Sequence, residues 1–407
     1  MADVVAVLVA ARDEEGWVGR MVETLRSSFP GARIIVADDG SSDATAAAAE
    51  RAGASVLRLP ARGKGQALTL AEREAPPGRI VLADADVEGN LAPLAASEDD
   101  VTIAAFAERV GGGFGIAKRV GRALVRALSG FEAREPLSGQ RSLSQVARDA
   151  CFPLAAGYGC EVRMTIDAVR GGLRVSEREL PLQHRPTGRD AAGFAHRARQ
   201  LGDALLACGP TAVNHRGLRL PLVGWLFGLR GPWPVRAVAA IGLADDLWSG
   251  DARGFRGHLQ ARRSTGVLKL VGIPLVALGA TRSLRSATAV SLAANFLNQL
   301  DTRPGRALKA FLVGSAIVRG EALTYAAVAV LLAPYDLREM TMLGDTGSNA
   351  LGAVLGFNSV MRSRGRRQWL AIGVLATVTA LGEKRSLGEM IERTPILREL
   401  DGFGRQP

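Results

Sequence analysis

The stretch Ile-Val-Leu-Ala-Asp-Ala-Asp-Val, at residues 80–87, decides the fold of the N-terminal part of this chain. A short apolar run that ends in carboxylates is typical of a buried strand that leaves the edge of a sheet. Because alternate residues of an extended chain share a face, Asp84 and Asp86 point the same way and offer the oxygen ligands that Mg²⁺ or Mn²⁺ prefers. The same pattern also occurs in solvated turns, so its interpretation depends on the residues around it.

The residues before this stretch alternate between short apolar runs and helical patterns. Strands are predicted at residues 4–10, 33–37 and 55–59, and helices at residues 17–28, 44–52 and 66–74. Such alternation predicts a mostly parallel, Rossmann-like α/β sheet, whose ligands bind beyond the carboxyl ends of the strands. The acidic residues that follow the predicted strands are therefore expected to converge on one crevice. They are Asp13, Asp38, Asp39, Asp84 and Asp86.

The composition of the 407 residues limits the classes of protein to consider. Hydrophobic residues make up 47% of the chain and aromatic residues 5%, which suits a large α/β core or partly membrane-embedded helices. The formal net charge of +11 indicates anionic partners. Because the arginines are scattered without interleaved aromatic residues, no nucleic-acid groove is expected. The three cysteines form no Cys-x-x-Cys pair, which argues against a disulfide framework or a zinc site.

Four motifs, in this order, resemble those of family-two glycosyltransferases with the GT-A fold. They read Ala-Arg-Asp-Glu-Glu (11–15), Val-Ala-Asp-Asp-Gly-Ser-Ser-Asp-Ala-Thr (36–45), Gly-Lys-Gly-Gln-Ala-Leu (63–68) and Asp-Ala-Asp (84–86). By this resemblance, Glu14 and Asp38 or Asp39 hold the base and ribose of a nucleotide sugar, and Lys64 lies near the nucleotide. Residues 38–43 also fit a turn with a helix N-cap at Asp43, and the two interpretations are compatible.

Three later segments resemble one branch of that family, which contains glucosyl-3-phosphoglycerate synthases and dolichyl-phosphate sugar synthases. They read Glu-Pro-Leu-Ser-Gly-Gln-Arg (135–141), Gly-Tyr-Gly-Cys-Glu (157–161) and His-Arg-Pro-Thr-Gly-Arg (184–189). The resemblance implies that residues 137–140, with Ser138 and Gly139, line the acceptor and sugar side. It also implies that Asp84 and Asp86 bind the metal-diphosphate and that His184 completes the metal shell. The metal would assist departure of the diphosphate.

Glu161 is the candidate general base of this predicted site. Inversion at the anomeric carbon needs a carboxylate that takes the proton of the acceptor. An acid in the first turn of a helix is also favoured by the helix macrodipole, without any catalytic function. Both interpretations of Glu161 stay open at this point.

The composition changes after residue 209, which divides the chain into predicted domains at 1–209 and 210–407. Seven apolar runs follow one another, at residues 235–244, 267–280, 287–297, 307–318, 322–333, 350–360 and 369–381. Most are shorter than the roughly 20 residues that a membrane span needs, so a soluble bundle is one interpretation. Because charges are confined to the breaks, we predict an all-α polytopic membrane domain. That prediction places the protein in the cell (inner) membrane, with the glycosyltransferase domain in the cytoplasm.

The acids within these runs resemble those of polyprenyl-phosphate N-acetylhexosamine-1-phosphate transferases. The motifs are Asp-Asp at 245–246, Asn-Phe-Leu-Asn-Gln-Leu-Asp at 295–301 and Gly-Asp-Thr-Gly-Ser at 344–348. The resemblance implies that Asp245, Asp246 and Asp345 bind Mg²⁺ and catalyse phosphoryl transfer. It implies also that Asn298 and Asp301 hold the nucleotide. No His-rich loop occurs near the C-terminus, so a reduced enzyme and a membrane scaffold for a lipid phosphate both remain open.

Together, these patterns predict a membrane-associated glycosyltransferase that uses a nucleotide-diphospho-sugar and Mg²⁺ or Mn²⁺. Its acceptor is predicted to be polyprenyl phosphate or another phosphorylated molecule, in the synthesis of a lipid-linked or envelope glycan. One alternative is transfer to a small phosphorylated acceptor, with an inactive membrane tail. The other is a lipid-glycan scaffold in which both halves have lost catalysis.

Overall fold

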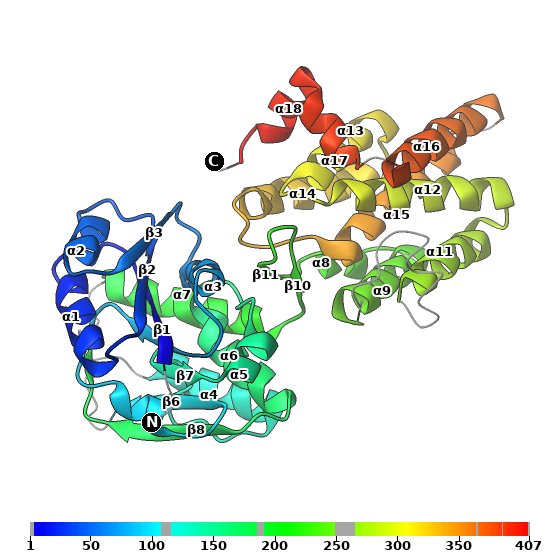
Figure 1. The fold of residues 1–407 in the computed structure, drawn as a ribbon. Coiled ribbons are helices and arrows are strands. Elements are labelled where there is room, and N and C mark those ends of the chain that lie inside the picture. Colours follow the sequence, from blue (N-terminus) through cyan, green and yellow to red (C-terminus); the bar gives the residue numbers. More distant parts are fainter. Residues whose placement is uncertain are drawn as a thin grey trace. The chain divides into compact units, whose positions relative to one another are not determined.

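The computed structural model describes residues 4–106, 115–184, 191–248, 265–363, 365–384 and 386–405. The chain divides into two compact units, Met1–Gly209 and Pro210–Pro407 (Figure 1). Each unit has its own hydrophobic clusters.

The N-terminal unit is built on a seven-stranded sheet with the strand order β3-β2-β1-β4-β7-β6-β8. Its strands are β1 Val4–Ala11, β2 Arg33–Asp39, β3 Ser55–Leu59, β4 Arg79–Asp84, β6 Val101–Phe106, β7 Arg141–Leu143 and β8 Val175–Leu180. Strand β7 runs antiparallel to both of its neighbours, and all other neighbours are parallel. The α/β sheet predicted for this unit is therefore present.

Helices and a small second ribbon surround this sheet. The helices are α1 Val18–Ser28, α2 Thr45–Arg51, α3 Lys64–Arg73, α4 Ile116–Ser129, α5 Gln145–Cys151, α6 Cys160–Arg170 and α7 Ala191–Cys208, with 3₁₀ turns η1 Ala92–Ala96 and η2 Gly157–Gly159. The ribbon pairs β5 Val87–Glu88 with β9 Gln183–His184.

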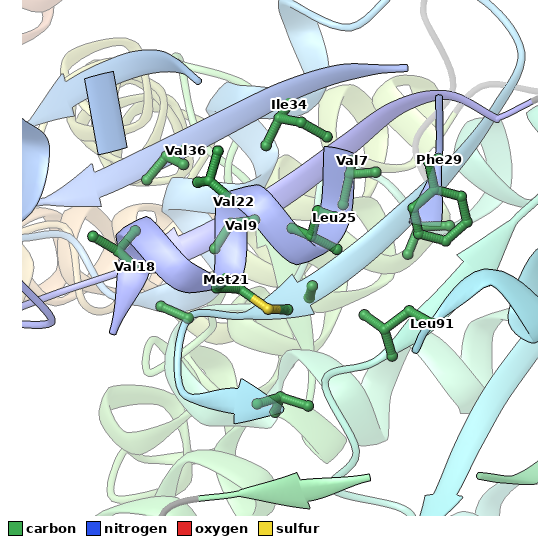
Figure 2. Packing of buried hydrophobic residues seen from close by; sticks show 14 of the residues in the cluster. Val7, Val9, Val18, Met21, Val22, Leu25, Phe29, Ile34, Val36 and Leu91 are labelled. Carbon is green, nitrogen blue, oxygen red and sulfur yellow. The ribbon is translucent and has the colours of Figure 1, made fainter. Parts of the chain in front are cut away.

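The period of two along β1 places its side chains on both faces of the sheet. Val7 and Val9 point to the face covered by α1, where they pack with Leu25 (Figure 2). Leu8 points to the opposite face and packs with Leu68 of α3. Each of these side chains is buried, and burial of one aliphatic side chain stabilises a fold by about 1.5–3 kcal/mol. Because both faces of β1 are packed, its register against β2 and β4 is fixed. The carboxyl ends of these strands therefore lie at one edge of the sheet.

In its described residues, the C-terminal unit consists of helices and one hairpin, β10 Thr211–Val213 with β11 Arg219–Pro221. Its helices are α8 Trp225–Leu229, α9 Trp233–Trp248, α11 Thr265–Thr281, α12 Leu284–Leu300, α13 Arg306–Val318, α14 Ala322–Leu337, α15 Gly344–Arg362, α16 Arg366–Lys384, α17 Leu387–Arg393 and α18 Pro395–Gly402. Helix α15 lies against α8, α9, α12, α13 and α14. It approaches α12 closely because of glycine: a Cβ atom at Gly352 would lie 2.4 Å from the carbonyl oxygen of Ala293.

The prediction of a polytopic membrane domain is wrong, and the predicted multi-pass location in the inner membrane is wrong with it. Among the described residues, no helix is both long enough and apolar enough to cross a bilayer. Helices α11 to α14 have 13 to 17 residues, whereas a span needs about 20. Helices α15 and α16 reach 19 residues but include polar and charged positions. The apolar runs instead supply the clusters around α15.

One buried acid of this unit has a strongly shifted pKa. Asp336, near the end of α14, is 4% exposed, and its Oδ2 accepts a hydrogen bond of 2.7 Å from the Gly305 N–H. Burial raises the pKa of this carboxyl to about 6, although the Gly305 hydrogen bond and the charge of Arg405 act against the rise. The folded state therefore holds this proton more tightly than the unfolded state.

We predict that this proton makes stability depend on pH. The free energy of unfolding should fall as the pH rises from about 4 to about 6, and the loss from Asp336, about 3 kcal/mol, is complete above that window. Asp336→Asn removes the charge, so the variant should match the wild type near pH 4 and exceed its stability near pH 7.5. Urea unfolding followed by tryptophan fluorescence measures the free energy of unfolding of the wild type and of the variant at each pH. A stability difference independent of pH would contradict the assignment.

Candidate active site

Three separate segments of the N-terminal unit bring charged side chains together around Lys64. The Lys64 Nζ lies 2.5 Å from Asp84 Oδ1 and 2.6 Å from Glu161 Oε1. Lys64 is the first residue of α3, Asp84 is the last residue of β4, and Glu161 lies in the first turn of α6. The cluster therefore lies at the carboxyl end of β4, where an α/β sheet binds its ligands.

Two glycines allow α3 to begin at this point. Gly63 precedes the helix with a φ of 92°, a left-handed conformation that glycine adopts readily. A Cβ atom at Gly65 would lie 1.8 Å from the carbonyl oxygen of Ala155. The start of α3 thus packs directly on the segment that leads into α6, and this close contact brings Lys64 to Glu161.

The charge of Lys64 is held in place by its two partners. Burial by itself lowers the pKa of Lys64, but the carboxylates of Asp84 and Glu161 outweigh this effect and raise that pKa well above its usual value. Lys64 is therefore a permanent cation that can attract an anion, and it is unsuited to be a general base. Glu161 is 4% exposed, and its Oε2 also accepts a contact of 3.2 Å from the Cys160 thiol.

Residues 138–140, which precede β7, close one side of the cluster around Lys64. A Cβ atom at Gly139 would lie 2.4 Å from Asp84 Oδ2 and 2.6 Å from the Lys64 Nζ, so a larger residue there would displace the ends of these two side chains. Gln140 donates from Nε2 to Asp84 Oδ2 at 3.2 Å. Within the described part of the chain, the buried Ser138 Oγ and Gln140 Oε1 have no hydrogen-bond partner. Buried polar atoms are normally paired, so these two suit contact with a ligand.

Arg141 holds this segment in position, and the sequence analysis gave it no function. Its buried guanidinium donates to the carbonyl oxygen of Ser138 at 2.8 Å and to that of Pro136 at 3.3 Å. It also donates to Thr165 Oγ1 of α6 at 2.9 Å. An arginine directly after Ser-Gly-Gln at the start of a strand was the available signal, but sequence does not disclose burial.

The two acids at the end of β2 accept backbone N–H groups. Both oxygens of Asp39 accept backbone N–H groups, from Arg62 at 2.6 Å and from Gly63 at 2.8 Å, and burial raises the pKa of this carboxyl. Asp38 Oδ1 accepts the N–H of Ser41 at 3.1 Å. Asp39 thereby connects the end of β2 to the loop that leads into Lys64.

The loop after β1 is tied to the loop after β2. Asp13 has a φ of 55° and accepts the N–H of Ser42 on Oδ1 at 2.7 Å. The N–H of Glu14 donates to Thr45 Oγ1 at 2.7 Å. Asp43 Oδ1 accepts the N–H of Thr45 at 3.0 Å, but the N-cap position of α2 is Ala44 and not Asp43 as predicted. The predicted nucleotide-binding acids thus lie in two loops that are hydrogen-bonded to each other.

The predicted metal ligands are described in part. Asp86 is half-buried and follows Asp84 in the turn between β4 and β5. The backbone of His184 pairs with Val87 across the small ribbon, and the side chain of His184 lies outside the described residues. Among the side chains that are described, no three His, Cys, Asp or Glu residues form a ready metal cluster. Asp84 and Asp86 are the donors that this edge of the sheet offers.

The acids predicted in the C-terminal unit also come together, around Lys269 of α11. The Lys269 Nζ lies 2.6 Å from Asp245 Oδ2 and forms a second ion pair with Asp345. Burial raises the pKa of Asp345, while hydrogen bonds from Asp345 and Lys269 outweigh burial and lower that of Asp245. The Lys269 ammonium thus lies between the two carboxyl groups and offsets their charge.

Two further acids of this unit, Asp246 and Asp301, lie near the start of α15. Asp246 accepts the N–H groups of Asp345 at 2.9 Å and of Thr346 at 2.8 Å, so it caps the helix. Burial, together with nearby carboxylates, raises the pKa of Asp301 well above its usual value. Asn298 lies one turn before Asp301 near the end of α12.

Part of the N-terminal unit is similar to a known protein family. Residues 6–90 match the family model described as Glycosyl transferase family 2. This segment contains β1 to β4 and therefore Lys64, Asp84 and Asp86. Residues 6–90 of the N-terminal unit are thus similar to glycosyltransferase family 2.

Particular relatives cover parts of the chain. Glycosyltransferase AglJ of Haloferax volcanii is 27% identical over 200 residues, which are 46% of this chain and 66% of AglJ. Protein RfbJ of Shigella flexneri is 36% identical over 61 residues, 15% of this chain and 47% of RfbJ. The chain thus spans less than two thirds of these relatives. A glucosyl-3-phosphoglycerate synthase of Mycobacterium tuberculosis, solved with Mn²⁺, UDP and phosphoglyceric acid, is 25% identical, with a TM-score of 0.43, over 51% of this chain and 79% of that one.

We predict that Gly139→Ala disrupts the cluster around Lys64. The new methyl group would overlap the Lys64–Asp84 ion pair, and such overpacking typically lowers the free energy of unfolding by about 1–3 kcal/mol. Gly202→Ala is the matched control, because open space surrounds that position. Thermal unfolding compares each variant with the wild type. The control should melt at or above the wild-type temperature because alanine is favoured within a helix, and a Gly139→Ala variant that melts at the wild-type temperature would contradict the described packing.

Proposed function

We propose that the protein transfers a sugar from a nucleoside-diphosphate sugar to a phosphorylated acceptor, with the help of Mg²⁺ or Mn²⁺. The observation that carries this proposal is the position of the Lys64 ammonium between Asp84 and Glu161, at the carboxyl end of β4. Lys64 and Asp84 lie within the segment that matches the glycosyltransferase family model, residues 6–90, and Glu161 lies beyond it.

The donor set at this edge fits a divalent cation bound to a diphosphate. Asp84 and Asp86 supply carboxylate oxygens, which are hard ligands that Mg²⁺ and Mn²⁺ prefer, and His184 follows them across the ribbon. A bound cation would stabilise the negative charge of the departing nucleoside diphosphate. Lys64 adds a fixed positive charge beside the same oxygens, so it attracts the diphosphate without exchanging a proton.

The remaining predicted residues divide between donor and acceptor. Glu14, Asp38 and Asp39 lie on the loops after β1 and β2, and we assign them to the nucleotide. Ser138 and Gly139 lie beside Asp84, and we assign them to the transferred sugar and the acceptor.

Glu161 is the proposed general base. Its carboxylate is buried, is oriented by Lys64 and Cys160, and lies on the same side as Asp84. A carboxylate held in this way can take the proton of an acceptor hydroxyl as that hydroxyl attacks the anomeric carbon. The macrodipole of α6 contributes to its stability in the same position.

The phosphoryl-transfer function of Asp245, Asp246 and Asp345, with the nucleotide contacts of Asn298 and Asp301, stays a prediction. Lys269 already neutralises two of these acids, and Asp246 caps α15. Metal binding by Asp345 would require the Lys269 ammonium to move, just as metal binding by Asp84 would require movement of Lys64. The two clusters differ in that residues 6–90 match the glycosyltransferase family model. We assign sugar transfer to the N-terminal unit, and polyprenyl phosphate enters as one of two acceptors to be tested.

The proposal predicts metal-dependent release of a nucleoside diphosphate. Purified protein is incubated with UDP- or GDP-sugars and either phosphoglyceric acid or undecaprenyl phosphate, and the released UDP or GDP is measured with Mn²⁺ and with EDTA. Asp86→Asn and Lys64→Met should each reduce release by about 100-fold or more, because both lose charge stabilisation of the leaving group.

Asp149→Asn is the matched control, because this acid is exposed on α5. Glu161→Gln should reduce transfer while leaving metal-dependent donor binding unchanged in calorimetry. Release that is indifferent to EDTA, or equal in Asp86→Asn and Asp149→Asn, would refute the proposed site.

A further inference from the structure

The packing of α12 against α15 determines which helix termini lie together at one end of the C-terminal unit. Helices α12 and α15 pack antiparallel, because Gly352 lies against Ala293 and Gly356 lies against Val290. The start of α12 therefore lies beside the end of α15. Helix α11 ends at Thr281, just before α12 begins, so its last turn belongs to the same end.

Two hydrogen bonds add further helices to this end. Gln368, in the first turn of α16, donates to Ser286 in the first turn of α12 at 3.0 Å. The N–H of Glu321, between α13 and α14, donates to Asn358 Oδ1 of α15 at 3.1 Å. The ends of α11, α13 and α15 and the starts of α12, α14 and α16 thus come together.

Six arginines gather at this end, which we call the arginine end. They are Arg282, Arg285, Arg319, Arg362, Arg366 and Arg367. Arg285 is partly buried and the other five are exposed. Within the described part of the chain, no ion pair joins any of them to a carboxylate, and Glu321 is the acid that accompanies them. The arginine end therefore presents a concentrated positive charge.

Helix stability does not account for this charge. A cation is favoured at the C-terminus of a helix and disfavoured at its N-terminus. Arg285 lies in the first turn of α12, and Arg366 and Arg367 lie in the first turn of α16. Three of the six arginines thus lie at helix N-termini, where the helix macrodipole disfavours a positive charge.

The backbone points to the same conclusion. Arg282 has a φ of 51° and Arg319 a φ of 56°, in the left-handed region that L-residues other than Asn and Asp rarely adopt. Glycine at either position would remove the conformational penalty but also the charge. Two arginines in such positions indicate that the charge itself is used.

Large apolar side chains are exposed among these arginines. Leu284 and Ile317 are each 76% exposed, Met361 is 80% exposed, and Trp369 and Leu370 are 59% and 68% exposed. Each adjoins an arginine in sequence or lies within one turn of it. Water solvates such side chains poorly, so the arginine end suits a partner that is anionic at its surface and apolar just beneath.

We propose that the arginine end docks on the surface of a bilayer that contains anionic lipids. The guanidinium groups would bind lipid phosphates, and the apolar side chains between them would enter the boundary between headgroups and acyl chains. This docking is interfacial and involves no helix that crosses the bilayer. It goes beyond the proposed sugar transfer, because it concerns a surface of the other unit.

A lipid surface fits better than a nucleic acid or a small anion. Bases require several aromatic platforms in a basic groove. At the arginine end, Trp369 is accompanied by Leu284, Ile317, Met361 and Leu370, which are aliphatic or thioether side chains. A small anion requires convergent donors in a pocket, whereas these arginines are spread over the exposed ends of several helices.

The test is co-sedimentation of the full-length protein with vesicles. One set contains phosphatidylcholine alone and the other an equal mixture with phosphatidylglycerol. The wild type should bind the anionic vesicles, and binding should weaken with added salt. The triple variant Arg362→Gln, Arg366→Gln, Arg367→Gln should bind about 100-fold more weakly, because each basic residue near an anionic surface contributes a similar electrostatic increment.

The control variant removes equal charge elsewhere in the same unit, by Arg338→Gln, Arg393→Gln and Arg398→Gln. These arginines are exposed and lie outside the arginine end. The control should bind as the wild type does, and circular dichroism verifies that all three proteins are folded. Three outcomes would each overturn the proposal: no binding of the wild type to anionic vesicles, equal binding to neutral vesicles, or equal losses in both triple variants.

Discussion

The N-terminal unit depends on one shared cation, the ammonium of Lys64 between the carboxylates of Asp84 and Glu161. Two carboxylates buried side by side would repel each other, and burial of either without a partner would be strongly unfavourable. Lys64 resolves both problems, and its own burial is offset by the same two charges. Much of the surrounding structure serves this contact: Gly63 and Gly65 allow α3 to start there, and Gly139 leaves space for the pair.

The C-terminal unit also places an ammonium between two carboxyl groups, and there the cluster stabilises the start of a helix. Lys269 neutralises Asp245 and Asp345, while Asp246 supplies the N-cap that α15 requires. Because α15 lies against five other helices, its start is a point at which the whole unit is anchored. A cluster that satisfies its own charges can maintain a fold without binding a ligand. That is the physical reason why acidic motifs alone do not establish a second active site.

Charge is distributed differently in sequence and in space. The arginines of the C-terminal unit are scattered along the chain, at the breaks between apolar runs. Because α12 and α15 pack antiparallel, the arginines in every second connection between apolar runs lie at the same end of the unit. The net charge of +11 is thus partly a local feature of one surface, which is the form in which charge can direct a partner.

The sequence by itself determined the N-terminal sheet. Its apolar runs have a period of two or are continuous, and glycines and acids mark their ends, so local patterns sufficed for β1 to β4. The sequence also placed Asp84 and Asp86 at a strand end, because that follows from position along the strand. The same reasoning failed for the C-terminal unit, because an apolar run looks alike whether it packs against α15 or enters a bilayer.

Only the tertiary structure decided which charged groups meet. The pairing of Lys64 with Glu161 joins residues that are nearly a hundred positions apart, and no periodicity encodes such a distance. The burial of Arg141 and its hold on the carbonyl oxygens of Pro136 and Ser138 depend likewise on the packing of β7 against α6. Local patterns specify which surface of an element is apolar, whereas the partner of a buried charge is set by how whole elements pack.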